Sequence, residues 1–361
     1  MSDAEVQLGL DTFGDVTVDL DGRRVASSQV VRDVVEQAVL ADEVGVDAIG
    51  LGEHHRDDYA ISAPDVVLAA IASRTSRILL GTAVTVLSSD DAVRVHERFA
   101  TLDAVSNGRA EVTLGRGSFT ESFPLFGLDL ADYETLFSEQ LDLFAALRDA
   151  DGPASWPGGR TRAAVSDVVV HPPLEHGPLR AWVGVGGSPE SVVRAARYRI
   201  PLMLAIIGGD PARFEPYVEL WHRATDELHD GLRLPVGVHS PGFVADTDDE
   251  ARELLWPHFK ANRDRIGRER GWGPTSREQF DTEADHGSLY VGSPETVARR
   301  IARTVATLGL DRFDLKYSNG PQPHPHLLRC IELYGREVIP RVRSLLADPS
   351  DMSDGSTAIR R

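Results

Sequence analysis

Short apolar runs alternate with longer stretches whose apolar residues recur at helical spacing, from the N-terminus to residue 346. An apolar run of about four to eight residues predicts a buried strand, whereas apolar residues at i, i+3, i+4 and i+7 predict an amphipathic helix. Residues that favour helix ends delimit several of these stretches, with Pro64 and Pro189 at starts and Gly45 and Asn107-Gly108 at ends. The alternation predicts an α/β fold with parallel strands.

The pattern predicts eight strands: Val6–Leu10, Ala48–Gly52, Ile78–Leu87, Ala110–Gly115, Ala181–Val185, Leu202–Ile207, Val236–Ala245 and Arg312–Tyr317. The predicted helices are Ser27–Val44, Pro64–Ser73, Ala92–Ser106, Asp132–Arg148, one from Pro189, one from Pro211, Asp248–Ile266, one from Ser293-Pro294, and His326–Leu346. Eight strand–helix units are typical of a (β/α)₈ TIM barrel. Because a count of strands does not show closure, a doubly wound sheet is the alternative.

We expect one barrel domain over residues 1–346, followed by a disordered polar tail over residues 347–361. The Gly- and Pro-rich segment Asp151–Arg162 is predicted to be a surface loop. Three insertions follow predicted strands or helices: Arg116–Gly127, Gly267–Gly287 and Asn319–His324. In a barrel these insertions would lie at the C-terminal face, where ligands bind.

Charge and composition exclude several classes of protein. The formal net charge is −18, which argues against binding to nucleic acid or to an anionic membrane surface. One cysteine, Cys330, excludes a disulfide framework within the chain and a thiolate zinc cluster. No signal peptide and no apolar run of membrane-spanning length is visible, so we expect a cytoplasmic protein.

Glu53-His54-His55 follows the second predicted strand. Histidine titrates near neutral pH, so this trio is a candidate for catalytic proton transfer; hydrogen bonding within a loop is the alternative. As a metal motif it is weak, because adjacent histidines point in different directions, and we assign no metal site.

Gly186-Gly187-Ser188-Pro189-Glu190-Ser191 follows the fifth predicted strand and opens a helix. The free N–H groups at a helix start favour an anion such as phosphate, and serine hydroxyls add donors. The alternative is a simple helix cap, since Gly292-Ser293-Pro294-Glu295 repeats the pattern with one glycine fewer. The chain has no Walker A motif, and no G-x-G-x-x-G opens a helix after the first strand.

Arg116 stands between two glycines, immediately after the fourth predicted strand. The flanking glycines allow close approach of a phosphate or carboxylate, to which a guanidinium offers two parallel donors. A surface-turn arginine is the alternative.

These motifs, in this order, resemble the luciferase-like flavin monooxygenases, the family of the bacterial luciferase α subunit. The resemblance covers Val6–Arg343. It is most specific in GLGEHH at Gly50–His55, in Arg77–Gly117, and in Gly186–Leu204.

The resemblance implies a TIM barrel that binds reduced FMN at its C-terminal mouth. It implies that Arg116, Gly187, Ser188 and Ser191 hold the flavin phosphate, and that Ala83-Val84 forms a cis peptide beneath the isoalloxazine ring. His54 matches the histidine implicated in the luciferase reaction, with Glu53 and His55 in support. One departure is Arg199, where relatives often have glycine, and it affects a local turn.

The hypothesis that follows is an FMN-dependent monooxygenase. Reduced FMN, delivered by a separate flavin reductase, would react with O₂ and oxidise a small organic substrate; the resemblance also implies a homodimer. Three alternatives stay open: hydride transfer with the deazaflavin F420, a metal-dependent hydrolase using His54, His55, His239, His286 or His324, and a flavin-binding protein without turnover.

Overall fold

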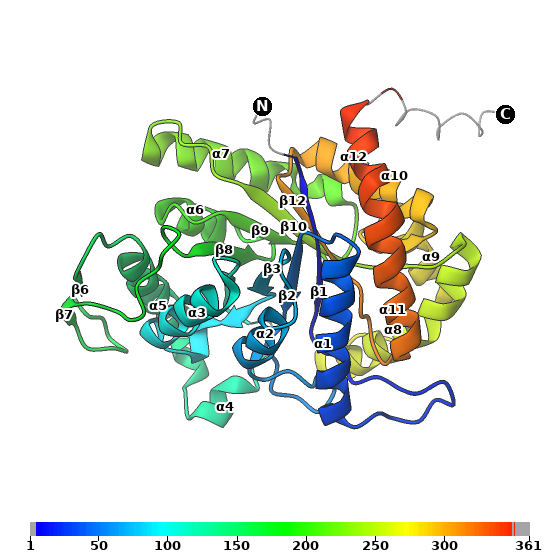
Figure 1. Cartoon of the computed structure of the whole chain (residues 1–361), viewed down its shortest axis with the longest axis horizontal. Helices are drawn as coiled ribbons and strands as arrows, with labels where there is room; N and C mark the ends of the chain where they lie inside the picture. The colour runs from blue at the N-terminus through cyan, green and yellow to red at the C-terminus, as the bar shows by residue number, and fades with distance from the viewer. Residues whose placement is uncertain (1–4, 118, 349, 351–361) are drawn as a thin grey trace.

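Nine parallel strands form a barrel in the computed structural model, which describes residues 5–117, 119–348 and 350 (Figure 1). Around the barrel the order is β3, β2, β1, β12, β10, β9, β8, β5 and β4, and a parallel bridge between Leu80 and Ala110 joins β3 to the β5 segment. The predicted TIM barrel is therefore confirmed. The strands are β1 (Gln7–Thr12), β2 (Ala48–Leu51), β3 (Leu79–Thr82), β4 (Thr85–Val86), β5 (Glu111–Gly115), β8 (Arg180–Val185), β9 (Leu202–Ala205), β10 (Val236–Val244) and β12 (Arg312–Lys316).

Helices surround this barrel, each with an apolar face turned toward the strands (Figure 1). In α1, for example, Val30, Val34, Ala38 and Ala41 are buried at helical spacing. The main helices are α1 (Ser27–Glu43), α2 (Pro64–Ala72), α3 (Ala92–Ser106), α5 (Tyr133–Arg148), α6 (Pro189–Arg197), α7 (Glu215–His229), α8 (Asp248–Arg270), α10 (Pro294–Leu308), α11 (His324–Leu333) and α12 (Ile339–Ala347). None of these or the other described helices is both long enough and apolar enough to cross a membrane.

The predicted strand Ile78–Leu87 is two strands, β3 and β4, which occupy one position of the barrel. Between them lie Ala83 and Val84, joined by a cis peptide bond, as the resemblance implies. The break was invisible in the hydrophobic pattern because both halves of the run are apolar. Because β3 and β4 share one position, the nine strands occupy eight positions around the barrel.

Two predicted loops contain regular structure. The segment predicted as a surface loop contains β6 (Ala154–Trp156), which pairs antiparallel with β7 (Val165–Val168) just after that segment. In the Gly267–Gly287 insertion, α8 continues to Arg270 and α9 (Arg277–His286) follows, before β11 (Tyr290–Gly292) pairs with β10. A capping box between Ser276 and Gln279 explains the start of α9.

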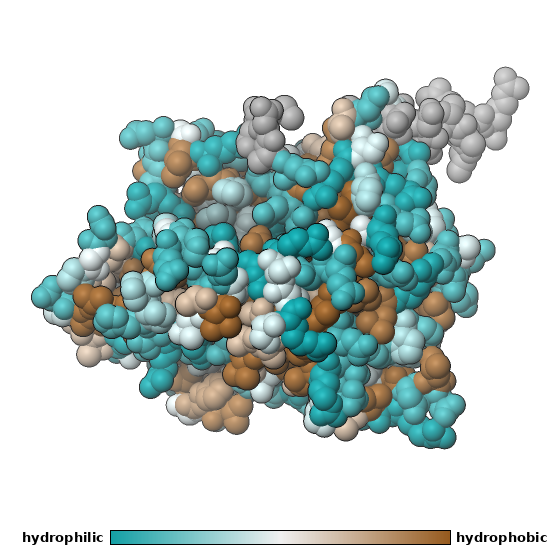
Figure 2. Space-filling model, viewed as in Figure 1, coloured by the Kyte–Doolittle hydropathy of each residue, from teal (hydrophilic) through white to brown (hydrophobic). Residues whose placement is uncertain are grey.

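Two further segments bear on the predictions. The Arg116–Gly127 insertion contains the short helix α4 (Ser122–Phe126), and Figure 2 shows an apolar cluster over it; Leu125, Phe126 and Leu130 are the exposed apolar side chains there. The last predicted helix is α11 and α12 joined by one π-helical turn, Tyr334–Val338. The predicted tail after α12 lies, apart from residues 348 and 350, outside the described residues.

Candidate active site

A cavity of about 1090 Å³ opens at the carboxyl ends of the barrel strands. Its floor includes Asp11 from β1, Thr82 from β3, Gly115 from β5 and Lys316 from β12, and the insertions form its walls. The volume is slightly above the usual range of ligand pockets, about 300–1,000 Å³. The cavity therefore has room for a cofactor and a substrate together.

Glu53 and His55 bind each other. The His55 Nε2 lies 3.0 Å from Glu53 Oε1, and Glu53 Oε2 accepts a hydrogen bond of 3.0 Å from the Val86 N–H in β4. The hydrogen bond to Glu53 raises the pKa of His55, against an opposing effect of burial. This pair ties the loop after β2 to the strand that follows Val84.

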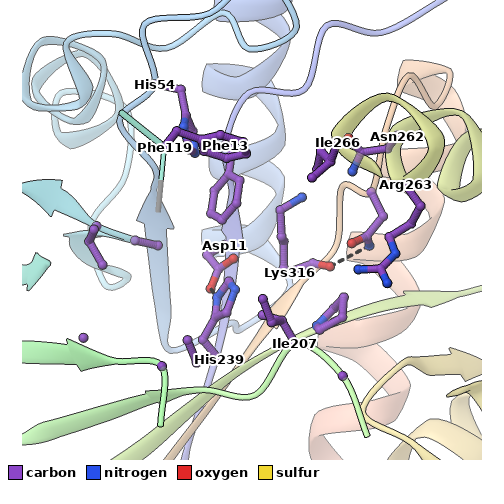
Figure 3. A pocket seen from close by; sticks show the side chains of 18 of the residues that line it. Asp11, Phe13, His54, Phe119, Ile207, His239, Asn262, Arg263, Ile266 and Lys316 are labelled. Atoms are coloured by element: carbon purple, nitrogen blue, oxygen red, sulfur yellow. Dashed lines mark hydrogen bonds and ion pairs between the residues drawn. The ribbon is translucent and has the colours of Figure 1, made fainter. Parts of the chain in front are cut away.

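His54 points away from this pair and sits among aromatic rings (Figure 3). Its ring stacks on Tyr59 with centroids 4.4 Å apart, and lies 4.8 Å from the Phe13 ring and 5.4 Å from the Phe119 ring. Its Nδ1 lies 3.9 Å from Glu121 Oε1. Burial favours a raised pKa for Glu121, but its interaction with His54 helps to hold this pKa below the ordinary value, so Glu121 is ionised at neutral pH.

Ala83 and Val84 form an apolar platform in the cavity wall, and three glycines make room for it. A Cβ on Gly50 would lie 3.1 Å from the Ala83 Cβ. A Cβ on Gly115 would lie 2.4 Å from Val84 Cγ2, and one on Gly184 would lie 3.1 Å from Val84 Cγ1. These glycines come from β2, β5 and β8, so side chains on three strands would displace the platform.

Of the predicted anion-binding residues, Arg116 lines the cavity, whereas Gly187, Ser188 and Ser191 do not. These three follow Gly186 in the sequence, and Gly186 lines the cavity. The Ser188 hydroxyl accepts a hydrogen bond from the Ser191 N–H and donates one of 2.7 Å to Glu190. The hydrogen bond from Ser188, and to a lesser extent the charge of Arg116, lower the pKa of Glu190.

Two arginines share one carboxylate. Glu134 on α5 forms an ion pair with Arg116 and another, at 3.2 Å, with Arg194 on α6. The Arg194 Nη1 is buried without a hydrogen-bond partner among the described residues. A Cβ on Gly186 would meet nothing within 4 Å. Free N–H groups at an open helix start, with an arginine nearby, can bind a phosphate group.

Sequence reasoning missed a second pair of polar residues in the cavity (Figure 3). His239 Nδ1 lies 2.6 Å from Asp11 Oδ2, and both residues are buried. Because a carboxylate accepts, the Nδ1 of His239 is the donor in this pair. His239 was considered only as a metal ligand. The signal for Asp11 is an acidic residue at the carboxyl end of the first apolar run.

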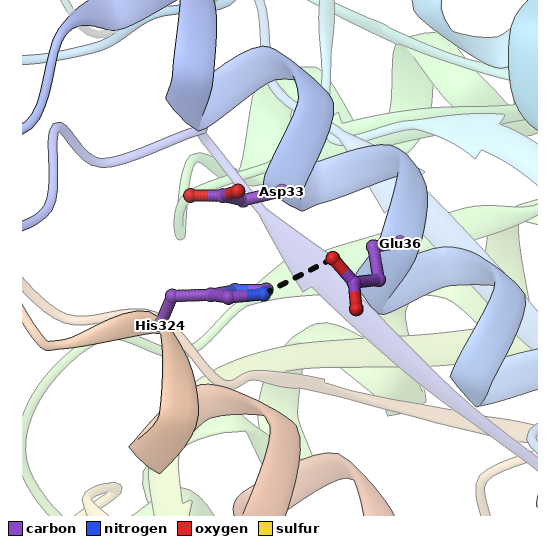
Figure 4. A group of neighbouring side chains, drawn as sticks. All are labelled: Asp33, Glu36 and His324. Atoms are coloured by element: carbon purple, nitrogen blue, oxygen red, sulfur yellow. Dashed lines mark ion pairs between the residues drawn. The ribbon is translucent and has the colours of Figure 1, made fainter.

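The histidines of the metal-hydrolase alternative do not form a metal site in the cavity. Among the residues that the structure describes, one group of His, Cys, Asp or Glu side chains has ligand atoms close enough to share an ion: Asp33, Glu36 and His324 (Figure 4). These residues belong to α1 and α11 and do not line the cavity.

Comparisons with known proteins agree with this architecture. The family model described as luciferase-like monooxygenase matches residues 14–312. The 4-hydroxyprotoasukamycin monooxygenase of Streptomyces nodosus subsp. asukaensis is 26% identical over 90% of this chain and 88% of its own length.

Two solved structures share the fold. The oxygenating constituent of 3,6-diketocamphane monooxygenase from Pseudomonas putida, in complex with FMN, has a TM-score of 0.73 and 18% identity over 94% of this chain and 99% of its own. An F420-dependent secondary alcohol dehydrogenase has a TM-score of 0.71 and 18% identity over the same shares. The family model spans most of the barrel, and the chain belongs to the luciferase-like monooxygenase family.

Proposed function

We propose that the chain is an FMN-dependent monooxygenase that uses reduced FMN, supplied by a separate reductase, and O₂ to oxidise a small organic substrate. The observation that carries this proposal is that Arg116 and Gly186, just before α6, line one large cavity whose wall includes Ala83 and Val84. Family membership and the FMN complex of a protein with the same fold support it.

In this proposal the phosphate of FMN is held by Arg116, Gly187, Ser188 and Ser191, and the ring lies against Ala83-Val84. When bound, reduced FMN supplies the electrons with which O₂ is activated and one oxygen atom is transferred to the substrate. The chain itself must then bind the substrate, exclude water and manage protons.

His54 is the residue that we assign to proton management. Its ring lines the cavity, and the rings of Phe13, Tyr59 and Phe119 surround it, so bulk water has little access to it. The Glu121 carboxylate lies 3.9 Å from the His54 Nδ1. We assign to His54 the transfer of a proton at the cavity wall, whereas Glu53 and His55 position its loop.

The test is the variant His54→Ala in an assay that couples NADH, FMN and a flavin reductase to product formation from a panel of organic substrates. We expect normal folding, unchanged FMN binding and a loss of turnover of about 10²- to 10⁴-fold, the usual contribution of a general acid–base group. His55→Ala is expected to lose less. Turnover of His54→Ala close to the wild-type rate would refute the assignment.

One alternative has a specific observation in its favour, because the fold is shared with an F420-dependent secondary alcohol dehydrogenase. The two functions differ in their reactants. Reduced FMN and O₂ consumption support the monooxygenase, whereas reduction of F420 by an alcohol under nitrogen supports the dehydrogenase. Turnover in either assay excludes a flavin-binding protein without catalysis.

A further inference from the structure

Cationic side chains line the cavity of this acidic protein: Arg116, Arg263, Arg270, Arg312 and Lys316. Three of them are neutralised by the chain itself. Arg116 pairs with Glu134, Arg312 with Glu111 and Asp314, and Lys316 with Asp15. A cavity cation that has no carboxylate partner in the chain is a candidate position for an anionic group of a ligand.

Arg263 is such a cation. It lies on α8, and the residues of this helix that line the cavity follow one helical face: Phe259, Asn262, Arg263, Ile266 and Arg270. Figure 3 shows the Arg263 side chain extending from α8 into the cavity. Over the described part of the chain, no carboxylate lies within ion-pair distance of its guanidinium, which is half-buried.

The one contact recorded for the Arg263 guanidinium within the described chain is with an aromatic ring. Its Cζ lies 5.0 Å from the centroid of Trp272, in the segment between α8 and α9. A ring contact of this kind engages the flat face of a guanidinium and leaves its edge N–H groups free. Two acidic residues of the cavity lining do not pair with Arg263. Glu283 accepts hydrogen bonds from the Gly209 and Ser288 N–H groups, and Glu278 is exposed.

The surroundings of Arg263 combine further hydrogen-bonding groups with apolar surface. Asn319 donates to the carbonyls of Gly242 and Lys316, and this leaves its side-chain oxygen as an acceptor. Asn262 is half-buried beside Arg263 in the sequence and lines the same cavity. The apolar lining of the cavity includes Phe13, Ile207, Phe259, Ile266 and Leu289.

We propose that Arg263 binds a carboxylate group of the substrate, with Trp272 behind the guanidinium and an apolar or aromatic substrate body against the apolar lining. A planar carboxylate matches two edge N–H groups of arginine. This inference rests on the proposed function, because it names the class of substrate that binds in the same cavity. The phosphate of FMN is assigned to a different group of residues, around Arg116.

The experiment measures binding of benzoate, phenylacetate and hexanoate, each paired with its uncharged amide, to the full chain without FMN by isothermal titration calorimetry. We expect saturable binding of at least one carboxylate, at least 10-fold tighter than its amide. In Arg263→Gln that carboxylate is expected to bind at least 10-fold more weakly, about 1.4 kcal/mol, while the amide is unchanged. Arg268→Gln, an exposed arginine of the same helix outside the cavity, is the matched control and leaves both unchanged.

Measuring FMN and carboxylate binding in both variants separates this inference from the proposed flavin site. Arg263→Gln is expected to keep wild-type FMN affinity, and Arg116→Ala is expected to keep carboxylate affinity. The inference is wrong if no carboxylate binds, if the carboxylates bind no better than their amides, or if Arg263→Gln binds them like the wild type. Carboxylate selectivity that persists in a protein that binds no FMN would refute the proposed function and leave the Arg263 site standing.

Discussion

Two helices of the barrel begin with the same four residues and differ in what faces their starts. Gly187-Ser188-Pro189-Glu190 opens α6, and Gly292-Ser293-Pro294-Glu295 opens α10. In both, the serine hydroxyl accepts a hydrogen bond from a backbone N–H three residues on. As helix caps the two are equivalent.

At the start of α10, a carboxylate of the protein itself already binds the free hydrogen-bond donors. Asp248 accepts hydrogen bonds of 2.6 Å from the Ser293 N–H and 2.9 Å from the Thr296 hydroxyl. A Cβ on Gly292 would lie 2.6 Å from the same carboxylate. The start of α6 instead has open space above Gly186 and two arginines beside it. The comparison teaches that a capping motif becomes a ligand site only where other segments supply space and charge.

The largest effect is expected when a carboxylate is introduced at the open start of α6, as Asp248 supplies one at the start of α10. Gly186→Asp is tolerated sterically, because a Cβ there meets nothing within 4 Å. Its charge repels a phosphate, so FMN binding is expected to weaken at least 100-fold, about 2.8 kcal/mol. Gly186→Asn, with the same shape and no charge, is the control and should lose far less. Fluorescence titration of FMN measures both, and equal losses would mean that charge at this position is irrelevant.

The reverse change removes the carboxylate from the closed start. Asp248→Asn is expected to leave FMN affinity unchanged and to lower the free energy of unfolding by about 1–2 kcal/mol, since charge-assisted hydrogen bonds are lost. Burial favours a higher pKa for Asp248, but the bonds from Ser293 and Thr296 prevail and hold this pKa below 3.8.

This lowered pKa gives the substitution a pH signature. A carboxyl group whose pKa is depressed by folding stabilises the protein above its unfolded pKa, and this contribution is lost as the pH falls through the folded value. The difference between wild type and Asp248→Asn in urea unfolding should therefore be full at pH 7 and should shrink below about pH 3.8. A difference independent of pH would contradict the role of the ionised carboxylate.

The smallest effect concerns the other ends of the same two helices. Gly309 follows α10 with φ 62°, whereas Arg199 holds the corresponding left-handed position after α6 with φ 53°. Arg199→Gly removes the cost of a side chain in this conformation and loses an exposed ion pair with Asp149, for a net gain of about 0.5–1 kcal/mol. Urea unfolding measures it, and a loss of stability would show that the ion pair dominates.

The sequence predicted the barrel well because each strand and helix is specified by local periodicity and local end signals. That Arg116 and Ser188 hold one phosphate stays a prediction; both follow parallel strands, whose carboxyl ends meet at one face of the barrel. The capping box at Ser276 was readable and would have predicted α9.

The rest depends on residues distant in sequence. The break between β3 and β4 requires glycines from three other strands, and no local signal reports their positions. The Asp11–His239 pair joins strands more than two hundred residues apart. Asp248 occupies the start of α10 and not that of α6, because α8, which carries it, packs against β11. Only the folded chain shows this packing.

The central claim is that the open start of α6, with Arg116, binds the phosphate of FMN, and one pair of titrations tests it most directly. FMN and riboflavin, which lacks the phosphate, are titrated into wild type, Arg116→Ala and the control Ser293→Ala. We expect Arg116→Ala to weaken FMN by about 10- to 100-fold, since a charge-assisted hydrogen bond contributes about 1.5–3 kcal/mol, and to leave riboflavin unchanged. Ser293→Ala should alter neither affinity. Equal weakening of FMN and riboflavin in Arg116→Ala would contradict this placement of the phosphate.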